Sequence, residues 1–335
     1  MSAILRLASR QSALALTQTR WVAAALRQHW PALRIEEVHV TTTGDRIQDR
    51  PLAEVGGKGL FVGEVQACLR EGRADVAVHS LKDVPGDHER RADLQLVCFP
   101  VRAPAEDVLV TAHGLELDDL EAGSRIGTSS ARRVVQLSER RPDLAYVPLR
   151  GNVDTRLARV RAGHLDGAIL AAAGLARLGL LGQVPHRVLH PEWCIPAVGQ
   201  GSLALEIRAG DEAARGYLLP LRHWPTHIVT AAERSFLRTL EGNCHAPMAG
   251  HARLDPDGKR LSFHGLVASP HGEARLRAGA ERFLSGRTPP DNEAFATALG
   301  REVAEALLAQ GAQKLMLQAA ASALDPRLAF VSREN

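Results

Sequence analysis

The sequence predicts an α/β protein with two mainly parallel sheets, followed by a smaller α+β domain. Between Ile4 and Arg208, short apolar runs alternate with helix-length segments that are apolar on one face, which is the β-α-β pattern of parallel sheets. The pattern pauses near Pro104 and then restarts, which indicates two such domains. After Pro225 it changes to one long helix and strands of alternating polarity. A chain of 335 residues is long enough to form three separate cores.

The first domain opens with an apolar strand at residues 4–8, and Ser12 lies at the start of a helix that reaches about residue 29. Residues 44–59 are polar and rich in glycine, as in a loop. The other elements expected here are strands at 35–41, 75–79 and 94–100 and a helix at 60–70.

The second domain repeats the pattern, with strands expected at 108–111, 125–127, 145–149 and 168–170 and helices at 130–140, 153–162 and 172–178. A strand at 203–208 has no helix of its own nearby, so we expect it to return to the first sheet. The third domain should hold helices at 225–240 and 293–309 around alternating strands near Phe263. The expected domains are therefore 1–100 with 196–218, 101–195, and 219–335.

Composition argues against several classes of protein. Aromatic residues make up only 4% of the chain and the net charge is +3, which disfavours a nucleic-acid binder in spite of a pI near 8.8. The N-terminus lacks the apolar segment of a signal peptide, and no apolar run is long enough to span a membrane. The four cysteines form no CxxC pair and the 14 histidines form no metal-binding motif. We expect a cytoplasmic protein without a metal site.

The most informative segment is residues 75–85. An apolar run ends at Val78 and is followed at once by His79, Ser80, Lys82 and Asp83. Ligands of open α/β sheets bind beyond the carboxyl ends of the strands. A lysine beside an aspartate at that place can bind an anion and move a proton. The alternative is a surface turn with a solvated ion pair.

Arginines and hydroxyl groups gather at three expected strand–helix junctions. Backbone N–H groups at a helix start bind anions, and arginine grips carboxylates with two parallel hydrogen bonds. Each junction alone could be an ordinary helix cap with solvated arginines. Together they predict a site for a ligand with several carboxylates or phosphates. The residues concerned are Arg6, Arg10 and Ser12; Thr128, Ser129, Ser130, Arg132 and Arg133; and Arg150, Gly151 and Arg156.

Two loops add to this prediction. The segment from Val55 to Phe61 is a glycine-rich entry to a helix that includes Lys58; it lacks the Ser or Thr of a nucleotide-binding P-loop, so we expect a cationic lid or plain helix-entry packing. Cys244 follows Gly242 and Asn243, which favour the end of a helix, so its thiol lies on a loop. A thiol near arginines would be nucleophilic.

The remaining cysteines give weaker signals. Cys68 lies on an amphipathic helix and Cys98 in an apolar strand, so both are expected in the core. Cys194 can be assigned to neither setting from its neighbours.

Taken together, these segments resemble the porphobilinogen deaminase family over nearly the whole chain. The similarity lies in their shared order and spacing. The matching segments are Leu7–Ser12, Val55–Phe61, Val78–Pro85, Gly127–Ser130, Leu149–Val153, Pro196–Gly201 and the Cys244 loop.

The resemblance implies a specific chemistry. Members of the family carry a dipyrromethane cofactor bound as a thioether to the loop cysteine, here Cys244, and add four porphobilinogen molecules to it with loss of ammonia. Water then releases the linear tetrapyrrole hydroxymethylbilane. Asp83 would be the catalytic carboxylate, helping to protonate the departing amine and stabilising the cationic azafulvene.

The resemblance also implies a fold and binding residues. Two α/β domains of the type II periplasmic-binding-protein kind would face a cleft, hinged near residues 100–104 and 192–199, in a monomeric enzyme. Lys58 and Phe61 would belong to the lid, and Gln200 would lie where the second domain returns to the first. The cofactor would be held by Lys82, Asp83, Thr128, Ser129, Ser130, Arg132, Arg133, Arg150 and Gly151, and the substrate by Arg6, Arg10, Ser12, Arg150, Arg156 and Gln200.

The main alternative is a non-catalytic binding module of the same two-lobed shape for a polyanionic metabolite. It would explain the arginines but would give no role to Cys244 or to the third domain. A covalent adduct on Cys244 would distinguish the two functions.

Overall fold

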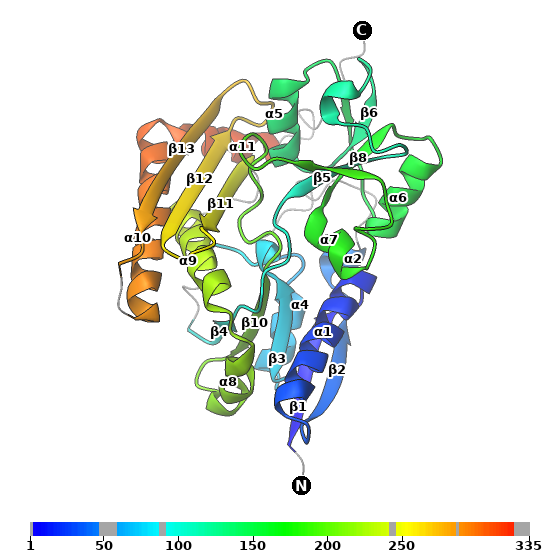
Figure 1. Cartoon of the computed structure of the whole chain (residues 1–335). Helices are drawn as coiled ribbons and strands as arrows, with labels where there is room; N and C mark the ends of the chain where they lie inside the picture. The colour runs from blue at the N-terminus through cyan, green and yellow to red at the C-terminus, as the bar shows by residue number, and fades with distance from the viewer. Residues whose placement is uncertain (1–2, 47–58, 87–91, 241–245, 286–287, 325–335) are drawn as a thin grey trace.

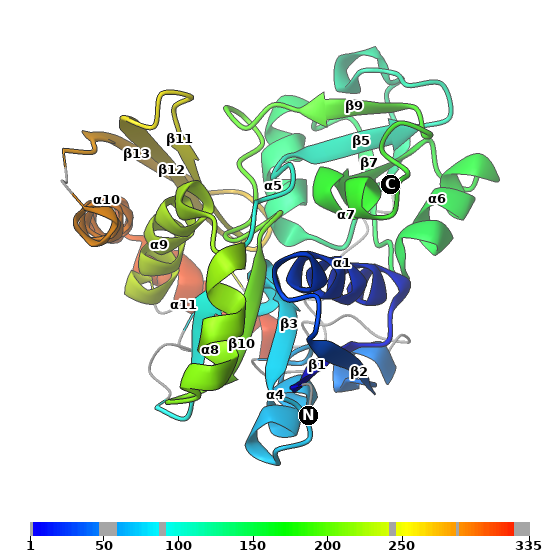
Figure 2. The same ribbon diagram turned by 60° about the horizontal axis from the view of Figure 1, so that its bottom comes forward.

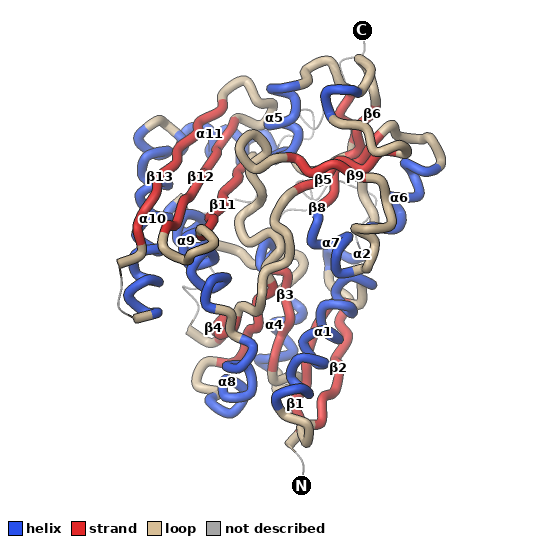
Figure 3. The backbone as a smooth tube through the Cα atoms, viewed as in Figure 1, coloured by secondary structure: helices blue, strands red, loops and turns tan. Residues whose placement is uncertain are grey.

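The computed structural model describes residues 3–46, 59–86, 92–240, 246–285 and 288–324. These residues form two five-stranded sheets and one three-stranded sheet, each with helices packed on it (Figures 1 and 3). We refer to the three sheets with their helices as the first, second and third lobes.

The first lobe has the strand order β2-β1-β3-β10-β4. Strands β2 and β3 pair parallel to β1, whereas β10 is antiparallel to its neighbours β3 and β4. The pairing of β10 confirms that residues 203–208 return to the first sheet. The elements of this lobe are β1 (Ile4–Arg10), α1 (Ala13–His29), β2 (Arg34–Val40), α2 (Thr43–Arg46), α4 (Gly63–Arg70), β3 (Val76–Ser80), η1 (Leu81–Asp83), β4 (Leu94–Cys98), β10 (Leu203–Arg208), α8 (Glu212–Leu218) and η4 (Leu219–Leu221).

The second lobe repeats this arrangement in the order β7-β6-β8-β5-β9. Strands β7 and β8 pair parallel to β6, and β5 is antiparallel to β8 and β9. Its elements are β5 (Asp107–Thr111), η3 (Leu117–Asp119), β6 (Arg125–Gly127), α5 (Ala131–Arg140), β7 (Ala145–Val147), α6 (Val153–Arg161), β8 (Gly167–Ala171), α7 (Ala172–Arg177) and β9 (His186–Leu189).

The two lobes exchange strands. The chain leaves β4 to supply the antiparallel strand β5 of the second sheet, and it leaves β9 to supply the antiparallel strand β10 of the first. The α/β class and the type II periplasmic-binding-protein fold predicted from the sequence are therefore confirmed. The two crossing segments, residues 99–106 and 190–202, touch where the amide of Ala103 donates to the carbonyl of Gly201 at 3.1 Å.

The third lobe is an antiparallel sheet, β11-β12-β13, packed against helices (Figure 2). Its core is built around Phe236 and Phe263, whose rings lie 5.0 Å apart. The elements are α9 (Trp224–Thr239), β11 (Met248–Leu254), β12 (Arg260–Ala268), β13 (Arg275–Phe283), α10 (Pro289–Ala309) and α11 (Ala312–Leu324).

The third lobe contacts both others. Leu266 and Ala249 of its sheet pack on Val135 of α5, and Arg275 donates to the Val135 carbonyl at 2.7 Å. On the other side, Arg234 of α9 donates to the carbonyls of the Val84–Pro85 segment, both at 2.7 Å. Helix α9 thus lies beside the residues that directly follow Asp83.

Several elements were not predicted from the sequence, among them β9, α8, β13 and α11. The expected loop at residues 44–59 is also wrong at its start, because the short helix α2 covers Thr43–Arg46. Strand β13 reads RLRAGAERF and is largely exposed, so it lacks the apolar signal of a buried strand. Strand β9 is also half exposed, and α8 has only seven residues. Among the described helices, none combines the length and the apolar character that crossing a bilayer demands.

Candidate active site

Asp83 lies on a tight turn at the carboxyl end of β3. Val76–His79 are buried, so the strand is fixed in the sheet, and the amide of Leu81 donates to the carbonyl of Ser202 at 3.0 Å. The 3₁₀ turn Leu81–Asp83 then buries Leu81 but leaves Lys82 exposed and Asp83 half-buried. The turn therefore presents a carboxylate and an ammonium group at the strand end, as predicted.

Gly199 presses against the back of this turn. Its φ of +74° is in the left-handed region, and a β-carbon there would lie 2.8 Å from Leu81 Cγ and 3.0 Å from the backbone nitrogen of Lys82. Only glycine fits this close approach. The second crossing segment therefore supports the turn that carries Asp83.

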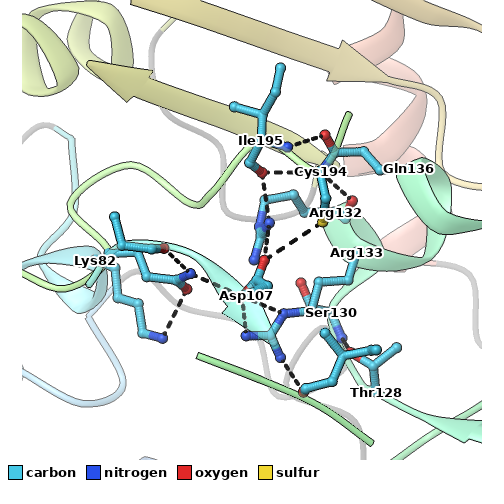
Figure 4. Close-up of polar contacts among 12 residues, drawn as sticks. Lys82, Asp107, Thr128, Ser130, Arg132, Arg133, Gln136, Cys194 and Ile195 are labelled. Carbon is cyan, nitrogen blue, oxygen red and sulfur yellow. Dashed lines mark hydrogen bonds and ion pairs between the residues drawn. The ribbon is translucent and has the colours of Figure 1, made fainter. Parts of the chain in front are cut away.

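A buried ion cluster lies in the part of the second lobe that faces the Asp83 turn (Figure 4). Asp107, fully buried at the start of β5, lies between Arg132 and Arg133 from the first turn of α5. Arg132 Nη1 is 2.7 Å from Asp107 Oδ2, and Arg133 Nη2 is 2.7 Å from Asp107 Oδ1. Burial would raise the pKa of Asp107, but the two guanidinium groups hold it far below its usual range.

The two arginines of this cluster are themselves nearly buried. Each is 6% exposed, and each also donates to a backbone carbonyl: Arg132 to Ile195 at 2.8 Å and Arg133 to Ile169 at 2.7 Å. One carboxylate is shared by two cations, so the cluster keeps a net positive charge. The alternative that these arginines are solvated beside an ordinary helix cap is therefore wrong for Arg132 and Arg133.

Gln200 connects this cluster to the Asp83 turn. Its amide nitrogen donates to the Ala105 carbonyl at 2.7 Å and to Asp107 at 2.9 Å, which leaves its oxygen to accept from Lys82 at 3.4 Å. Lys82 is accessible to solvent but has protein on most sides, and this partial loss of hydration lowers its pKa to about 8. Asp83 opposes the shift, and Arg133 adds to it.

Thr128, Ser129 and Ser130 form the strand–helix junction that precedes these arginines. Thr128 is buried and accepts from the amide of Ser130 at 3.2 Å. The Ser129 hydroxyl is 3.0 Å from both the amide and the carbonyl of Leu149, so it ties this junction to the next one. The Ser130 hydroxyl is half-exposed and makes no hydrogen bond to a described residue.

A second group of arginines adjoins the cluster. Gly151 has a φ of +99°, Asn152 caps α6, and Arg156 donates from Nε to the Gly151 carbonyl at 2.9 Å. Burial, together with the charges of Arg133 and Arg150, lowers the pKa of Arg156 to about 10. No described carboxylate lies within ion-pair distance of Arg156. A cation in that setting is expected to bind an anion from outside the chain.

Arg177, at the end of α7, also lies near the site, although it was not predicted from the sequence as a site residue. It donates to the Gly201 carbonyl at 2.7 Å, and burial lowers its pKa to about 10. It too has no acidic partner among the described residues. Helix α7 lies beside α1 of the first lobe (Figure 2), so Arg177 sits where the lobes meet. The signal available was one arginine in the otherwise apolar run Ala172–Leu178.

Arg6 is not at the predicted edge. It lies near the start of β1 and binds Asp75, which precedes β3, with Nη2 at 2.7 Å and Nε at 3.0 Å. Since β1 and β3 run parallel, Arg6 and Asp83 lie at opposite ends of the sheet. The expectation that Arg6 binds substrate is therefore wrong.

Arg10 and Ser12 do lie at the carboxyl end of β1, but both have local partners. Arg10 is paired with Asp45 and stacks over the Phe61 ring at 4.3 Å. The Ser12 side chain caps α1 by accepting from the amide of Ala15 at 3.3 Å. These contacts fix the first junction and use some of the hydrogen-bond donors of Arg10, which a ligand could otherwise bind.

Two predicted residues, Lys58 and Cys244, lie outside the described part of the chain. Cys68 and Cys98 are buried, as predicted, and so is Cys194. Burial raises the pKa of the Cys98 and Cys194 thiols to about 12. No group of three or more metal-binding side chains is found among the described residues.

The comparisons with known proteins agree over nearly the whole chain. Residues 5–216 match the family model "Porphobilinogen deaminase, dipyromethane cofactor binding domain", and residues 228–309 match "Porphobilinogen deaminase, C-terminal domain". A porphobilinogen deaminase from Syntrophobacter fumaroxidans is 44% identical over 313 residues, which cover 93% of this chain and 97% of that protein. One from Sorangium cellulosum is 47% identical over 299 residues, covering 89% and 96% respectively.

Among solved structures, similarity is found to the substrate binding domain of a putative molybdenum ABC transporter from Clostridium difficile. That structure has a TM-score of 0.40 and 11% identity, over 66% of this chain and 93% of the other.

Proposed function

The chain belongs to the porphobilinogen deaminase family, and on that premise we propose that Asp83 is its catalytic carboxylate and Cys244 the residue that carries its cofactor. The enzyme is a transferase that joins porphobilinogen units head to tail into the linear tetrapyrrole hydroxymethylbilane, with loss of ammonia at each addition. It uses a dipyrromethane cofactor. The proposal concerns which side chains serve these steps.

The observation that carries the proposal is the short polar connection from Lys82 through Gln200 to Asp107 and the paired arginines. It joins the turn that holds Asp83 to the buried ion cluster of the second lobe. A substrate held by its carboxylates on the second lobe would therefore have its reacting carbon near a carboxylate of the first.

The donor set fits a dipyrromethane. Each pyrrole of this cofactor carries an acetate and a propionate, and bound there it supplies the free pyrrole position to which the next unit is joined. The side chains around the buried cluster are cations and hydroxyl groups, which are suited to carboxylates. We assign the cofactor to Lys82, Ser129, Ser130, Arg132, Arg133 and Arg150, with Thr128 and Gly151 shaping the backbone around them.

Asp83 would act on the porphobilinogen aminomethyl group. As ammonia departs, positive charge develops on the methylene carbon and spreads into the pyrrole ring. A carboxylate beside the ring stabilises that charge and accepts a hydrogen bond from the pyrrole N–H. Because Asp83 is half-buried, water screens this interaction only in part. Lys82 next to it would hold a substrate carboxylate and so fix the ring's orientation.

The growing chain gains two carboxylates with every unit. Arg156 and Arg177, which have no acidic partner among the described residues, can each accept one without breaking an existing ion pair. We propose that they bind the substrate or the elongating chain, together with Arg150. The predicted lid with Lys58 and Phe61 would cover this ligand. In the described part, Phe61 rests on Gly44 beneath Arg10.

We further propose that the enzyme works in the cytoplasm as a monomer. The three described cysteines are buried free thiols, which a reducing compartment preserves. Sedimentation of the purified protein near 36.1 kDa would support a single chain, and a dimer mass would refute it.

Asp83→Asn tests the central assignment. The amide keeps the shape of the side chain but removes its charge and its ability to exchange a proton, so we expect kcat for porphobilinogen consumption to fall by about 10²–10⁴-fold. Asp118→Asn is the matched control, because Asp118 forms an exposed pair with Arg140. It should change kcat by less than about twofold. Near-normal turnover in Asp83→Asn would refute the assignment.

A further inference from the structure

Two buried glutamines, one on each face of the first sheet, support the last two residues of β3, one of them directly and the other through Glu206. Gln18 comes from α1 and Gln66 from α4, and both are almost fully buried, at 3% and 2% exposure. In Figure 2, β3 lies between these two helices. We call Gln18, Ser80, Gln66, Glu206 and His79 the glutamine clamp.

On the α1 face the contact is direct. Gln18 Nε2 lies 3.2 Å from the Ser80 hydroxyl, and the same hydroxyl lies 3.4 Å from Gln18 Oε1. Ser80 is the last residue of β3, directly before the 3₁₀ turn. The apolar core around it, with Val22 and Val78, offers no other reason for an amide at this place.

On the α4 face the contact runs through a carboxylate. Gln66 Nε2 donates to Glu206 Oε1 at 3.0 Å, and His79 Nε2 lies 2.8 Å from Glu206 Oε2. The Glu206 side chain is fully buried and the His79 side chain is 3% exposed. Glu206 belongs to β10, the neighbour of β3, where it sits diagonally opposite His79.

Such groups are poor choices if stability alone were needed. Burying an amide, an imidazole and a carboxylate costs free energy that their mutual hydrogen bonds only offset, and well-packed apolar residues often serve stability equally well. What fully satisfied polar networks do provide is a single geometry, because their hydrogen bonds are directional. The clamp imposes such a geometry on His79 and Ser80, from two sides.

These two residues are followed at once by the turn with Lys82 and Asp83. No flexible segment intervenes: Leu81 is buried and bonded to Ser202, and Gly199 lies against the turn. Any tilt of the strand end would therefore be passed to the Asp83 carboxylate. A misplacement of about 1 Å can cost about 10²-fold in rate.

We propose that the glutamine clamp positions Asp83 for catalysis, with Gln18 and Gln66 as its positioning residues. This inference rests on the catalytic role proposed for Asp83. In this inference the clamp orients the Asp83 carboxylate and does not itself contact the substrate.

The test replaces each glutamine by methionine, which has a similar length and no hydrogen-bonding amide. Gln18→Met and Gln66→Met should lower kcat about tenfold and change KM by less than about twofold. Thr19→Val is the matched control: Thr19 is fully buried on the same helix, and among the described residues its hydroxyl bonds to the Ala15 carbonyl of that helix alone. It should leave kcat within about twofold. If Gln66→Met fails to fold, the result for Gln18→Met decides alone. Gln18 has no charged partner in the clamp, so its replacement leaves no buried carboxylate short of a donor.

A double-mutant cycle separates positioning from a general loss of structure. Asp83→Glu moves the carboxylate outward by one methylene, so the position that the clamp maintains is already lost. In that background Gln18→Met should reduce kcat by less than about twofold more. A full tenfold further loss, or a normal kcat in Gln18→Met alone, would overturn the inference. If Asp83→Glu and Asp83→Asn both kept normal turnover, the proposed function itself would fail instead.

Discussion

The first and second lobes have the same strand topology but treat their arginines differently. In the first lobe, Arg6 is paired with Asp75 and Arg10 with Asp45. In the second lobe, Arg132 and Arg133 share the single carboxylate of Asp107. Among these four arginines, positive charge is thus neutralised locally in the first lobe and left in excess in the second.

Arg156 and Arg177 extend this excess, because neither has an acidic partner among the described residues. The first lobe contributes an accessible carboxylate instead, at Asp83. On the proposed assignments, one fold used twice would provide an anion-binding side and a catalytic side. What distinguishes Arg132, Arg133, Arg156 and Arg177 from Arg6 and Arg10 is the small number of their carboxylate partners among the described residues.

The comparison requires that the lobes keep their relative placement, and Glu233 helps to fix this placement. Its buried carboxylate accepts from Arg102 at 2.8 Å and from the Gly199 amide at 2.6 Å, so it anchors both crossing segments to α9. Glu233→Gln would leave Arg102 without a counter-charge. We expect a loss of about 3–5 kcal/mol in the free energy of unfolding, measured by denaturant titration.

The contribution of Glu233 to the free energy of unfolding should depend on pH in one direction. Burial would raise the pKa of Glu233, but Arg102 and His251 outweigh it and hold the pKa at about 2. The stabilisation is therefore complete above an ordinary glutamate pKa of about 4.3 and is lost as pH falls toward 2. The difference between wild type and Glu233→Gln should shrink over that window. Asp118→Asn, in an exposed pair, should cost less than about 1 kcal/mol at any pH, and an equal cost in the two variants would contradict the account.

Arg156 and Arg6 offer a matched pair from the two lobes. Arg156→Met keeps most of the packing of the side chain but removes a cation that has no acidic partner among the described residues, so we expect kcat/KM for porphobilinogen to fall about 10- to 100-fold. Arg150→Ala should impair cofactor assembly or chain extension in the same way. Arg6→Met removes a cation that Asp75 already neutralises, at the far end of the sheet. It should leave kcat/KM within about twofold, and a large loss there would reverse the comparison.

Lys82 gives the smallest expected effect, through its pKa of about 8. The ammonium group is present below that pH and is lost as pH rises through it, so its grip on a substrate carboxylate weakens. Between pH 7 and 9 we expect kcat/KM to fall about tenfold. Lys82→Arg should remove this fall, because a guanidinium stays charged throughout. An identical alkaline limb in both proteins would assign the titration to another group.

Much of the fold could be predicted from the sequence because apolar runs mark buried strands directly. The strands at 125–127 and 203–208 have the predicted bounds, and the others differ by a few residues. Strand β13 could not be predicted, because one of its faces is exposed and it carries three arginines. Helix α11 buries Ala312, Leu315, Met316 and Ala319, but its many alanines and the exposed Leu317 make this apolar face hard to recognise in the sequence.

The site was only partly predictable for a different reason. Lys82 and Asp83 directly follow a buried strand, so their place at its end follows from the local sequence. Arg6 precedes Arg10 by four residues, which is about 13 Å along a strand, and this distance moves it to the opposite end of the sheet. The Asp107 partnership joins residues 25 or more positions apart, and nothing in either segment indicates it.

Intact-mass spectrometry of the enzyme given limiting porphobilinogen tests the account most directly. The wild-type protein should carry two pyrrole units on Cys244 at rest and then gain further units one at a time. Arg156→Met should stall early in this series, whereas Arg6→Met should complete it. A full series in Arg156→Met together with a stalled one in Arg6→Met, or a chain that never gains a pyrrole unit, would contradict the account.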